Sequence, residues 1–213
     1  DPDVDRLAFI SNDGEMFGEE YTLVAVADYV LSKTPGNTVS NMSSSRALRD
    51  ITEKHGGTYE ASAVGEVNVV ELMKKTNAII GGEGNGGIIY PSSHFGRDSM
   101  VGVALFLTYL ANQDKTVAEI RASYPQYYMS KNKIELTPQI DVDAILEALT
   151  TTYKNEQIST IDGVKIDFAT EWVHLRKSNT EPIIRIYTEA PTQQAADALA
   201  LRIIDEIKAV ISK

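Results

Sequence analysis

The sequence contains no cysteine, so disulfide bonds and thiolate metal sites are excluded. No apolar run is long enough to span a bilayer, and the first residues are acidic rather than those of a signal peptide, so we expect no membrane partner. Basic residues are in the minority, with 20 Lys and Arg against 30 Asp and Glu, which argues against nucleic-acid binding. The absence of cysteine fits a cytoplasmic protein. Any anionic ligand must be held by a local group of Arg and Lys.

The 213 residues, 43% of them hydrophobic, are enough for more than one compact unit with a buried core. In the first half, predicted strands and helices alternate, which favours a parallel or mixed α/β sheet with helices packed against it. The expected elements are strands over 7–11, 38–41, 58–63 and 78–81, and helices over 23–31, 43–55 and 66–75.

Residues 98–112 are apolar nearly all round, which predicts a helix that is buried on several sides. The pattern changes near residue 124, so we place a domain boundary between residues 123 and 131. The expected elements beyond it indicate an α+β unit: strands over 133–136, 163–168, 172–176 and 183–188, and helices over 142–149 and 196–210.

The first six residues place three carboxylates at alternate positions, Asp1, Asp3 and Asp5, followed by Arg6. These carboxylates repel one another at neutral pH, and a divalent cation removes that repulsion by taking one oxygen from each. Such an oxygen set suits Mg²⁺, and Arg6 can reach a phosphate that the metal also touches. The alternative is a solvated acidic loop. An EF-hand is disfavoured, because Arg6 stands at its glycine position and Asn12 at its bidentate glutamate position.

Residues 81–87 contain five glycines directly after a predicted strand, together with Glu83 and Asn85. Glycine permits positive φ and close approach of the backbone to a ligand. A carboxylate and a carboxamide on one loop suit the vicinal hydroxyl groups of a sugar. The spacing matches neither a Walker loop nor a dinucleotide-binding fingerprint. A flexible hairpin without a ligand is the alternative.

Residues 176–182 form a third segment, rich in cations and hydrogen-bond donors and ending at a proline. This composition fits a phosphate, held by guanidinium groups and by hydroxyl, amide and backbone donors. An ordinary polar turn between two strands is the alternative, although such a turn would not need so many donors. The residues predicted to bind phosphate are Arg176, Ser178, Asn179, Thr180 and Arg185.

The three segments together resemble the metal-binding, sugar-binding and phosphate-binding loops of the α-D-phosphohexomutases, the family of phosphoglucomutase, phosphomannomutase and phosphoglucosamine mutase. They occur in the family order, and the resemblance extends over essentially the whole chain. The family has four domains around a cleft. The resemblance implies that 1–15 is the tail of domain 2 with the metal-binding loop. It implies that 16–124 is domain 3, a mixed α/β three-layer sandwich, and that 125–213 is a smaller α+β domain 4 with an antiparallel sheet.

The resemblance also implies an activity, the interconversion of hexose 1-phosphates and hexose 6-phosphates by Mg²⁺-dependent phosphoryl transfer. Glucose and mannose phosphates are the favoured substrates, and a phosphoglucosamine mutase is the alternative. The family reaction passes through a phosphoserine and a hexose 1,6-bisphosphate, which also serves as activator. The phosphoserine lies in domain 1, in a Ser-His-Asn-Pro loop that this sequence does not contain. We therefore expect a fragment that is inactive without the N-terminal domains of the same protein.

On the family pattern, the three aspartates of the first segment would hold Mg²⁺ and Arg6 would contact the transferring phosphoryl group. Glu83 and Asn85 would bind sugar hydroxyls, and the residues of the basic turn would hold the phosphate that is not reacting. Glu66, at a strand-to-helix turn, is either a further sugar contact or a helix-start carboxylate that the helix dipole favours.

Two positions depart from the family pattern. Val4 replaces a small residue, commonly glycine, and Gly87 stands where many members carry a histidine that contacts the sugar. His94 could substitute for that histidine, although a lone histidine is more often structural. Arg97 and Asp98 resemble a family-typical Gly-Arg-Asp, which we interpret as an ion pair or helix start that supports the glycine segment.

Two other functions remain open at this point. The missing nucleophile leaves room for a non-catalytic module that only binds phosphosugars. The acidic segment also occurs in aspartate-rich phosphatases and in glycosyltransferases with a DxD motif, but neither class explains the basic turn.

Overall fold

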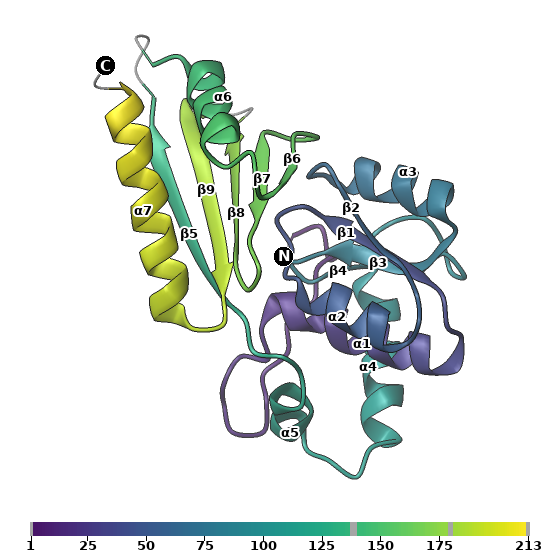
Figure 1. The fold of residues 1–213 in the computed structure, drawn as a ribbon. Helices are drawn as coiled ribbons and strands as arrows, with labels where there is room; N and C mark the ends of the chain where they lie inside the picture. Colours follow the sequence, from purple (N-terminus) through teal and green to yellow (C-terminus); the bar gives the residue numbers. More distant parts are fainter. Residues whose placement is uncertain (1, 137–139, 179–180, 212–213) are drawn as a thin grey trace. The chain divides into compact units, whose positions relative to one another are not determined.

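The computed structural model describes residues 2–136, 140–178 and 181–211, and it divides into two compact units, residues 1–125 and 126–213 (Figure 1). Each unit has a sheet of its own. Within the described ranges, no helix combines the length and the apolar character that crossing a membrane requires. The assignment of residues 1–15 to a preceding domain stays a prediction.

The first unit contains a four-stranded mixed sheet with the strand order β2-β1-β3-β4. The strand β1 pairs in parallel with both β2 and β3, and β3 pairs antiparallel with β4. This arrangement confirms the predicted mixed α/β sheet. The strands are β1 (Asn37–Asn41), β2 (Tyr59–Ser62), β3 (Ala78–Glu83) and β4 (Gly87–Ile89).

Helices cover both faces of this sheet and give the first unit three layers (Figure 1). Because successive residues of a strand point to opposite faces, Val39 of β1 packs on Val69 and Met73 of α3, whereas Thr38 faces α2. There the hydroxyl of Thr38 lies 2.6 Å from that of Thr52. The helices are α1 (Glu19–Lys33), α2 (Ala47–Lys54), α3 (Glu66–Thr76), α4 (Ser99–Ala111) and α5 (Val117–Ala122).

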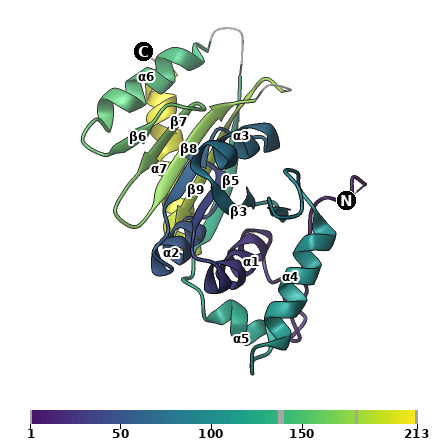
Figure 2. The same ribbon diagram turned by 90° about the vertical axis from the view of Figure 1, so that its right-hand side faces the viewer.

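The helix α4 is present where the sequence predicts it, but it is not buried on several sides. It lies beside α1 (Figure 2) and buries Phe106 almost completely. Met100 and Leu107 are 70% and 53% exposed. The prediction of burial on several sides is therefore wrong, because packing covers only part of a helix whose sequence is apolar nearly all round.

The predicted strand over 7–11 is also wrong. Among these residues only Ile10 forms a bridge, with Met16, and the preceding Arg6 forms another with Gly87. The expected turn follows them, and the backbone N–H of Ser11 donates to the carbonyl of Glu15. The segment is extended without forming a continuous ladder.

The second unit is an antiparallel sheet with the strand order β5-β9-β8-β7-β6. The helix α7 packs along β5 and β9 and contacts α6, so the helices share a core with one face of the sheet (Figure 1). The strand β5 starts earlier than predicted, and β6 is an additional strand. The elements are β5 (Tyr128–Glu135), α6 (Val142–Thr152), β6 (Gln157–Ser159), β7 (Val164–Asp167), β8 (Trp172–Lys177), β9 (Ile183–Ala190) and α7 (Gln193–Ile211).

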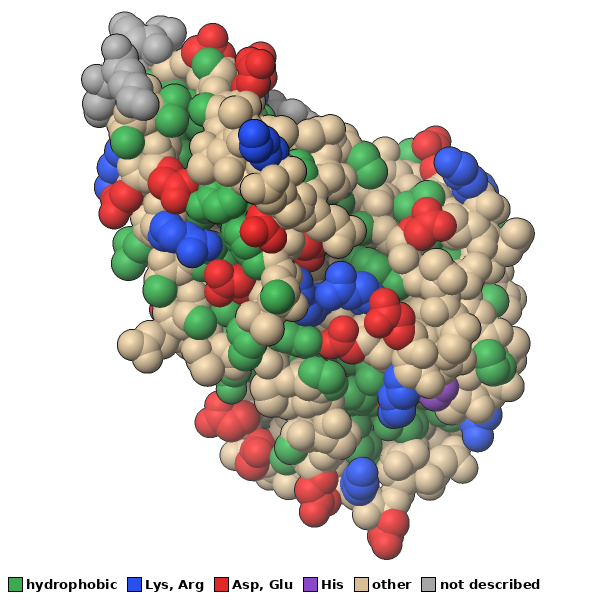
Figure 3. Space-filling model, viewed as in Figure 1, with side chains coloured by type: hydrophobic (Ala, Val, Ile, Leu, Met, Phe, Trp, Pro, Cys, Tyr) green, Lys and Arg blue, Asp and Glu red, His purple; other side chains and the backbone are tan. Residues whose placement is uncertain are grey.

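The formal net charge of −10 is not gathered into one acidic patch on the face drawn in Figure 3. Acidic and basic side chains are interspersed there, with apolar side chains between them. Charge on this face therefore acts through local pairs rather than through a single broad field.

Candidate active site

The site begins at one edge of the first sheet. The strands β1, β2 and β3 are parallel, so their carboxyl ends, at Asn41, Ser62 and Glu83, lie at the same edge. Open α/β sheets bind ligands outside the carboxyl ends of their strands. The carboxyl ends of β1, β2 and β3 are followed by residues 41–46, residues 63–66 and the glycine segment. Polar side chains from distant parts of the sequence therefore lie next to one another.

The glycine segment forms a tight hairpin between β3 and β4, rather than a loop that starts at Gly81. Glycine is required at Gly86, and at Gly84 it permits a close approach of the Glu20 side chain. Gly86 has a φ of 85°, and a Cβ there would overlap the backbone of Leu7. A Cβ on Gly84 would overlap the carboxylate of Glu20. The hairpin is therefore held closely by its neighbours and differs from the flexible hairpin that was the alternative reading.

The acidic segment, residues 2–6, lies directly against this hairpin. The backbone N–H of Leu7 donates to the carbonyl of Gly86 at 3.0 Å, and Arg6 forms a bridge with Gly87. Val4 has a φ of 55°, which a β-branched residue rarely adopts, and its carbonyl accepts a 2.6 Å hydrogen bond from the hydroxyl of Ser99. The start of α4 thus fixes the shape of the segment.

Arg97 joins the acidic segment to the glycine hairpin. Its Nη2 lies 2.6 Å from Oδ2 of Asp5, its Nη1 donates to Oε2 of Glu83 at 3.0 Å, and its Nε lies 3.2 Å from Oε2 of Glu66. Its backbone N–H also donates to Oε1 of Glu66 at 2.9 Å. One carboxylate predicted to bind metal and two predicted to bind sugar therefore surround one guanidinium group.

Glu83 is 5% exposed, and both of its carboxylate oxygens are engaged. Oε2 faces Arg97, and Oε1 accepts a 2.8 Å hydrogen bond from the amide of Asn41. Asn41 in turn organises the turn after β1, because its Oδ1 accepts from the backbone of Ser43 and from the hydroxyl of Ser44. This turn is why α2 begins at Ala47 rather than at residue 43, where the sequence predicts it.

The other predicted sugar contacts have roles inside the first unit. Oδ1 of Asn85 accepts a 3.1 Å hydrogen bond from the backbone of Gly87, which closes the hairpin turn. Glu66 is the first residue of α3 and pairs with Arg97. Sugar binding by Glu66, Glu83 and Asn85 stays a prediction.

Asp98, next to Arg97, caps α4 by accepting a 3.0 Å hydrogen bond from the backbone N–H of Val101. That hydrogen bond, and then the one with His94, hold the pKa of Asp98 below its ordinary value. Nε2 of His94 lies 2.9 Å from Oδ2 of Asp98. Asp98 starts α4, and Arg97 forms its ion pairs with other carboxylates, so the expectation of an ion pair or helix start beside the glycine segment is confirmed.

The predicted metal ligands are only partly within the described residues. Asp1 lies outside them, Asp3 is exposed, and Asp5 is mostly buried. Within the described ranges, no group of three His, Asp or Glu side chains is close enough to hold a metal ion. Oδ1 of Asp5 is nevertheless buried without a hydrogen-bond partner among these residues, although Nε of Arg6 lies 4.0 Å away. An orphaned carboxylate oxygen fits a cation ligand.

The predicted phosphate residues lie at the turn between β8 and β9 in the second unit. Arg176 and Arg185 are cross-strand partners, so their backbones lie side by side. Nη2 of Arg185 lies 2.7 Å from Oε2 of Glu181, and Nε of Arg176 lies 3.6 Å from a carboxylate oxygen of Asp162.

The rest of the basic turn is only partly described. The hydroxyl of Ser178 accepts a 3.3 Å hydrogen bond from the backbone N–H of Glu181, which closes the turn. Asn179 and Thr180 lie outside the described residues. Phosphate binding by the turn stays a prediction.

Sequence reasoning missed Asn41 and Ser44 and gave Arg97 only a supporting role. Asn41 is the last residue of a parallel strand, which is the one signal that marks it. The sequence around Arg97 does not predict its contact with Asp5, because most of the sequence of the first unit separates the two residues.

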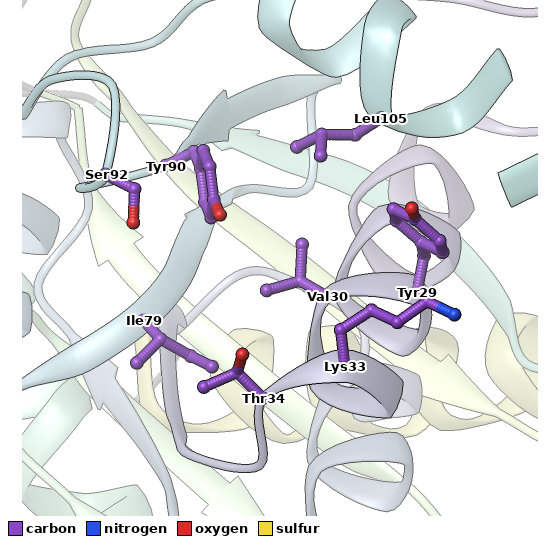
Figure 4. Close-up of a pocket in the computed structure, with 8 residues that line it drawn as sticks. All are labelled: Tyr29, Val30, Lys33, Thr34, Ile79, Tyr90, Ser92 and Leu105. Carbon is purple, nitrogen blue, oxygen red and sulfur yellow. The ribbon is translucent and has the colours of Figure 1, made fainter. Parts of the chain in front are cut away.

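A pocket of about 260 Å³ lies elsewhere in the first unit and contains none of these residues (Figure 4). Apolar side chains and the hydroxyls of Tyr29 and Tyr90 face it, with Lys33 at its side. The carboxylate cluster is identified by its chemistry and its place at the sheet edge, not by the volume of this pocket.

Comparison with known proteins identifies the family. Two family descriptions match: "Phosphoglucomutase/phosphomannomutase, alpha/beta/alpha domain III" over residues 18–128, and "Phosphoglucomutase/phosphomannomutase, C-terminal domain" over residues 111–206. The chain is similar to a phosphoglucomutase/phosphomannomutase of Thermococcus kodakarensis, 33% identical over 97% of this chain and 46% of the relative. It is also similar to a phosphoglucosamine/phosphogalactosamine mutase of Sulfurisphaera tokodaii, 32% identical over 99% of this chain and 47% of the relative.

A solved structure of a putative phosphomannomutase from Thermus thermophilus matches with a TM-score of 0.75 and 25% identity, covering 100% of this chain and 45% of that one. A family protein from Burkholderia thailandensis shares the fold with a TM-score of 0.78 over 98% of this chain and 44% of that one. The chain thus spans about half the length of the relatives it matches. Both of its units match consecutive domains of one family, and the chain belongs to the phosphoglucomutase/phosphomannomutase family.

Proposed function

We propose that the full-length protein is a Mg²⁺-dependent phosphohexomutase that interconverts hexose 1-phosphates and hexose 6-phosphates, with glucose and mannose phosphates as preferred substrates. Family membership supports the class of reaction. The observation that carries the proposal is the contact of Arg97 with both Asp5 and Glu83, since it joins the acidic segment and the glycine hairpin in one site.

In this proposal Asp1, Asp3 and Asp5 hold Mg²⁺, and the buried, unpartnered Oδ1 of Asp5 supports that role. The bound ion supplies neutralisation of the charge on a transferring phosphoryl group. Arg6, whose side chain is 44% exposed, contacts the same phosphoryl group through its guanidinium.

Glu83, Asn85 and Glu66 accept hydrogen bonds from sugar hydroxyls. The engaged oxygens of Glu83 do not prevent this, because a carboxylate has about four lone-pair sites and its protein partners use one on each oxygen. Arg97 and Asn41 thereby fix the direction in which Glu83 receives the sugar.

The residues of the basic turn that bind the phosphate that is not reacting are Arg176, Ser178, Asn179, Thr180 and Arg185. The exposed pair between Arg185 and Glu181 is a weak obstacle, since surface ion pairs contribute roughly 0–1 kcal/mol. A phosphate offers Arg185 a bidentate partner of higher charge.

The reaction requires a phosphoserine that none of these 213 residues supplies in the family's Ser-His-Asn-Pro form. We therefore expect the nucleophile in an N-terminal part of the full-length protein and a hexose 1,6-bisphosphate as intermediate and activator. The 213-residue chain alone should bind sugar phosphates without turning them over.

The test is an assay of the full-length protein with glucose, mannose and glucosamine phosphates, Mg²⁺ and a catalytic amount of bisphosphate. We expect interconversion of the 1- and 6-phosphates of glucose or mannose. Absence of interconversion for every sugar would contradict the proposal. Turnover by the 213-residue chain would show that the nucleophile lies within it.

A pair of matched variants tests the site. Asp5→Asn removes a proposed metal ligand and should lower kcat/KM at least about a hundredfold, since metal charge stabilisation supplies several kcal/mol of transition-state energy. Asp143→Asn makes the same change at an exposed position in α6 and should leave kcat/KM unchanged. Equal activity of the two variants would remove Asp5 from the mechanism.

The preferred hexose follows from the same assay. One relative is named a phosphoglucosamine/phosphogalactosamine mutase, so glucosamine phosphate is the specific competitor. A kcat/KM for glucosamine 1-phosphate above those for glucose and mannose 1-phosphates would replace our preferred substrates and leave the reaction class in place.

A further inference from the structure

We infer that Arg97 is a positioning residue that aims the carboxylate of Asp5 at a divalent cation. The inference rests on the proposed metal site in the acidic segment and goes beyond it, since it assigns the orientation of that site to a residue of the glycine-hairpin region. The direct contact is the 2.6 Å ion pair between Nη2 of Arg97 and Oδ2 of Asp5.

The guanidinium of Arg97 is held in place before any cation arrives. Glu83 accepts from its Nη1, and Glu66 lies against its Nε and accepts from its backbone N–H. The side chain is only 20% exposed, so water replaces little of this network. The guanidinium is planar, and its Nη1 and Nε already have fixed partners. Its Nη2 can therefore face Asp5 in one orientation only.

Asp5 receives that orientation. Its Oδ2 is used by Arg97, and its buried Oδ1 has no hydrogen-bond partner among the described residues. A buried carboxylate oxygen without a partner is destabilising, and a bound cation would offset that cost. The pairing therefore leaves one defined oxygen for metal, as is usual where an outer partner fixes a ligating carboxylate.

The local charge balance points to the same ligand. Asp5, Glu66 and Glu83 carry three negative charges around the single positive charge of Arg97. The group is left with a formal charge of about −2, which a divalent cation neutralises. Lysine could not replace Arg97 here, because a single ammonium cannot reach three carboxylates in a plane.

Gly87 provides the space that Arg97 occupies. A Cβ on Gly87 would lie 2.5 Å from Cδ of Arg97, so any side chain at residue 87 would displace the arginine. The placement of Arg97 can therefore be disturbed in two independent ways, by removing its guanidinium and by adding a methyl group at Gly87.

The experiment titrates Mn²⁺, as a paramagnetic substitute for Mg²⁺, into the 213-residue chain and measures free Mn²⁺ by electron paramagnetic resonance. Removal of a positive charge beside a cation site should by electrostatics alone tighten binding. If Arg97 instead positions Asp5, removing Arg97 should weaken Mn²⁺ binding. We expect Arg97→Gln, Arg97→Lys and Gly87→Ala each to weaken Mn²⁺ binding roughly 10- to 100-fold.

Arg202→Gln is the matched control, because Arg202 pairs with Glu171 in the second unit, and it should leave the Mn²⁺ affinity unchanged. Circular dichroism checks that each variant is folded. If Arg97→Gln does not fold, the Mn²⁺ affinity of Gly87→Ala tests the inference instead. Unchanged or tighter Mn²⁺ binding in the folded Arg97 and Gly87 variants overturns the inference about Arg97 but leaves the proposed metal site in place. A wild-type chain that binds no Mn²⁺, or binds it equally well as Asp5→Asn, overturns the proposed metal site and the inference together.

Discussion

His174 is a buried titratable group in β8 whose charge state depends on the fold. It is 1% exposed, and its Nε2 lies 2.7 Å from the carbonyl oxygen of Asp162. Burial lowers its pKa to about 4, with a smaller contribution from the positive charge of Lys165. The native state therefore keeps this imidazole neutral at pH values where an unfolded chain protonates it.

The consequence is a loss of stability in acid. With a native pKa below the unfolded value of about 6.5, the unfolded state binds the proton first as pH falls. The contribution of His174 is complete above pH 6.5 and is lost between pH 6.5 and 4. It should lower the free energy of unfolding by about 2 kcal/mol from pH 7 to pH 4.5.

Urea denaturation of the wild type and of His174→Gln at the two pH values isolates this contribution, because glutamine can still donate to the carbonyl and does not titrate. The variant should lose about 2 kcal/mol less than the wild type over this interval. An identical pH dependence in both proteins would mean that His174 does not titrate differently in the native and unfolded states.

Residues differ in how far the sequence predicts their roles. Asp5 and Glu83 stand out because each lies in a segment of unusual composition. Asn41 and Arg97 lie in unremarkable surroundings, and their importance comes from contacts across the fold with residues far away in the sequence. The composition of a segment reveals a group of acidic or glycine residues, but it does not reveal that Arg97 is the cation that pairs with Asp5 and Glu83.

The glycine hairpin offers a test at the level of an element. Gly86 and Gly14 have nearly the same φ, 85° and 87°, but a Cβ on Gly86 would overlap the backbone of Leu7, and one on Gly14 would meet nothing within 4 Å. Alanine at either position costs about 1–2 kcal/mol for the left-handed backbone. Gly86→Ala should lower the free energy of unfolding further, since Leu7 must move.

Chemical denaturation of both variants measures this difference. Gly86→Ala should also weaken Mn²⁺ binding, because Leu7 continues directly from the acidic segment, whereas Gly14→Ala should not. Equal destabilisation by the two substitutions would mean that the contact between hairpin and acidic segment contributes nothing beyond backbone strain.

Among the elements, periodic segments were predicted well and irregular ones poorly. The alternating strands and helices of the first unit follow from hydrophobic spacing, and so does the last helix. Residues 7–11 have the composition of a strand, but whether a strand forms depends on a partner elsewhere in the chain. The burial of α4 was predicted wrongly for the same reason, because the burial of a helix depends on the elements that pack against it and not on its own sequence.

At the scale of the whole molecule, the acidic composition is matched by internal pairing of the arginines that the proposal uses. Arg6, Arg176 and Arg185, which the proposal assigns to phosphate, each have a carboxylate within 4.0 Å. A phosphate must therefore compete with carboxylates of the protein. Composition predicts that such cations must be clustered locally, but only the structure identifies the competing partners.

The second unit provides the last prediction, that residues 126–213 fold on their own. Their core is formed by the sheet and two helices of this unit, and it includes Ile186, which is fully buried. We expect the isolated segment to unfold in one cooperative urea transition. Ile186→Ala should lower its free energy of unfolding by about 2–5 kcal/mol, because it leaves a cavity. Ile161→Ala, at a position 67% exposed, should change it by less than about 0.5 kcal/mol. A gradual transition, or equal effects of the two substitutions, would show that this core is not packed in the isolated segment.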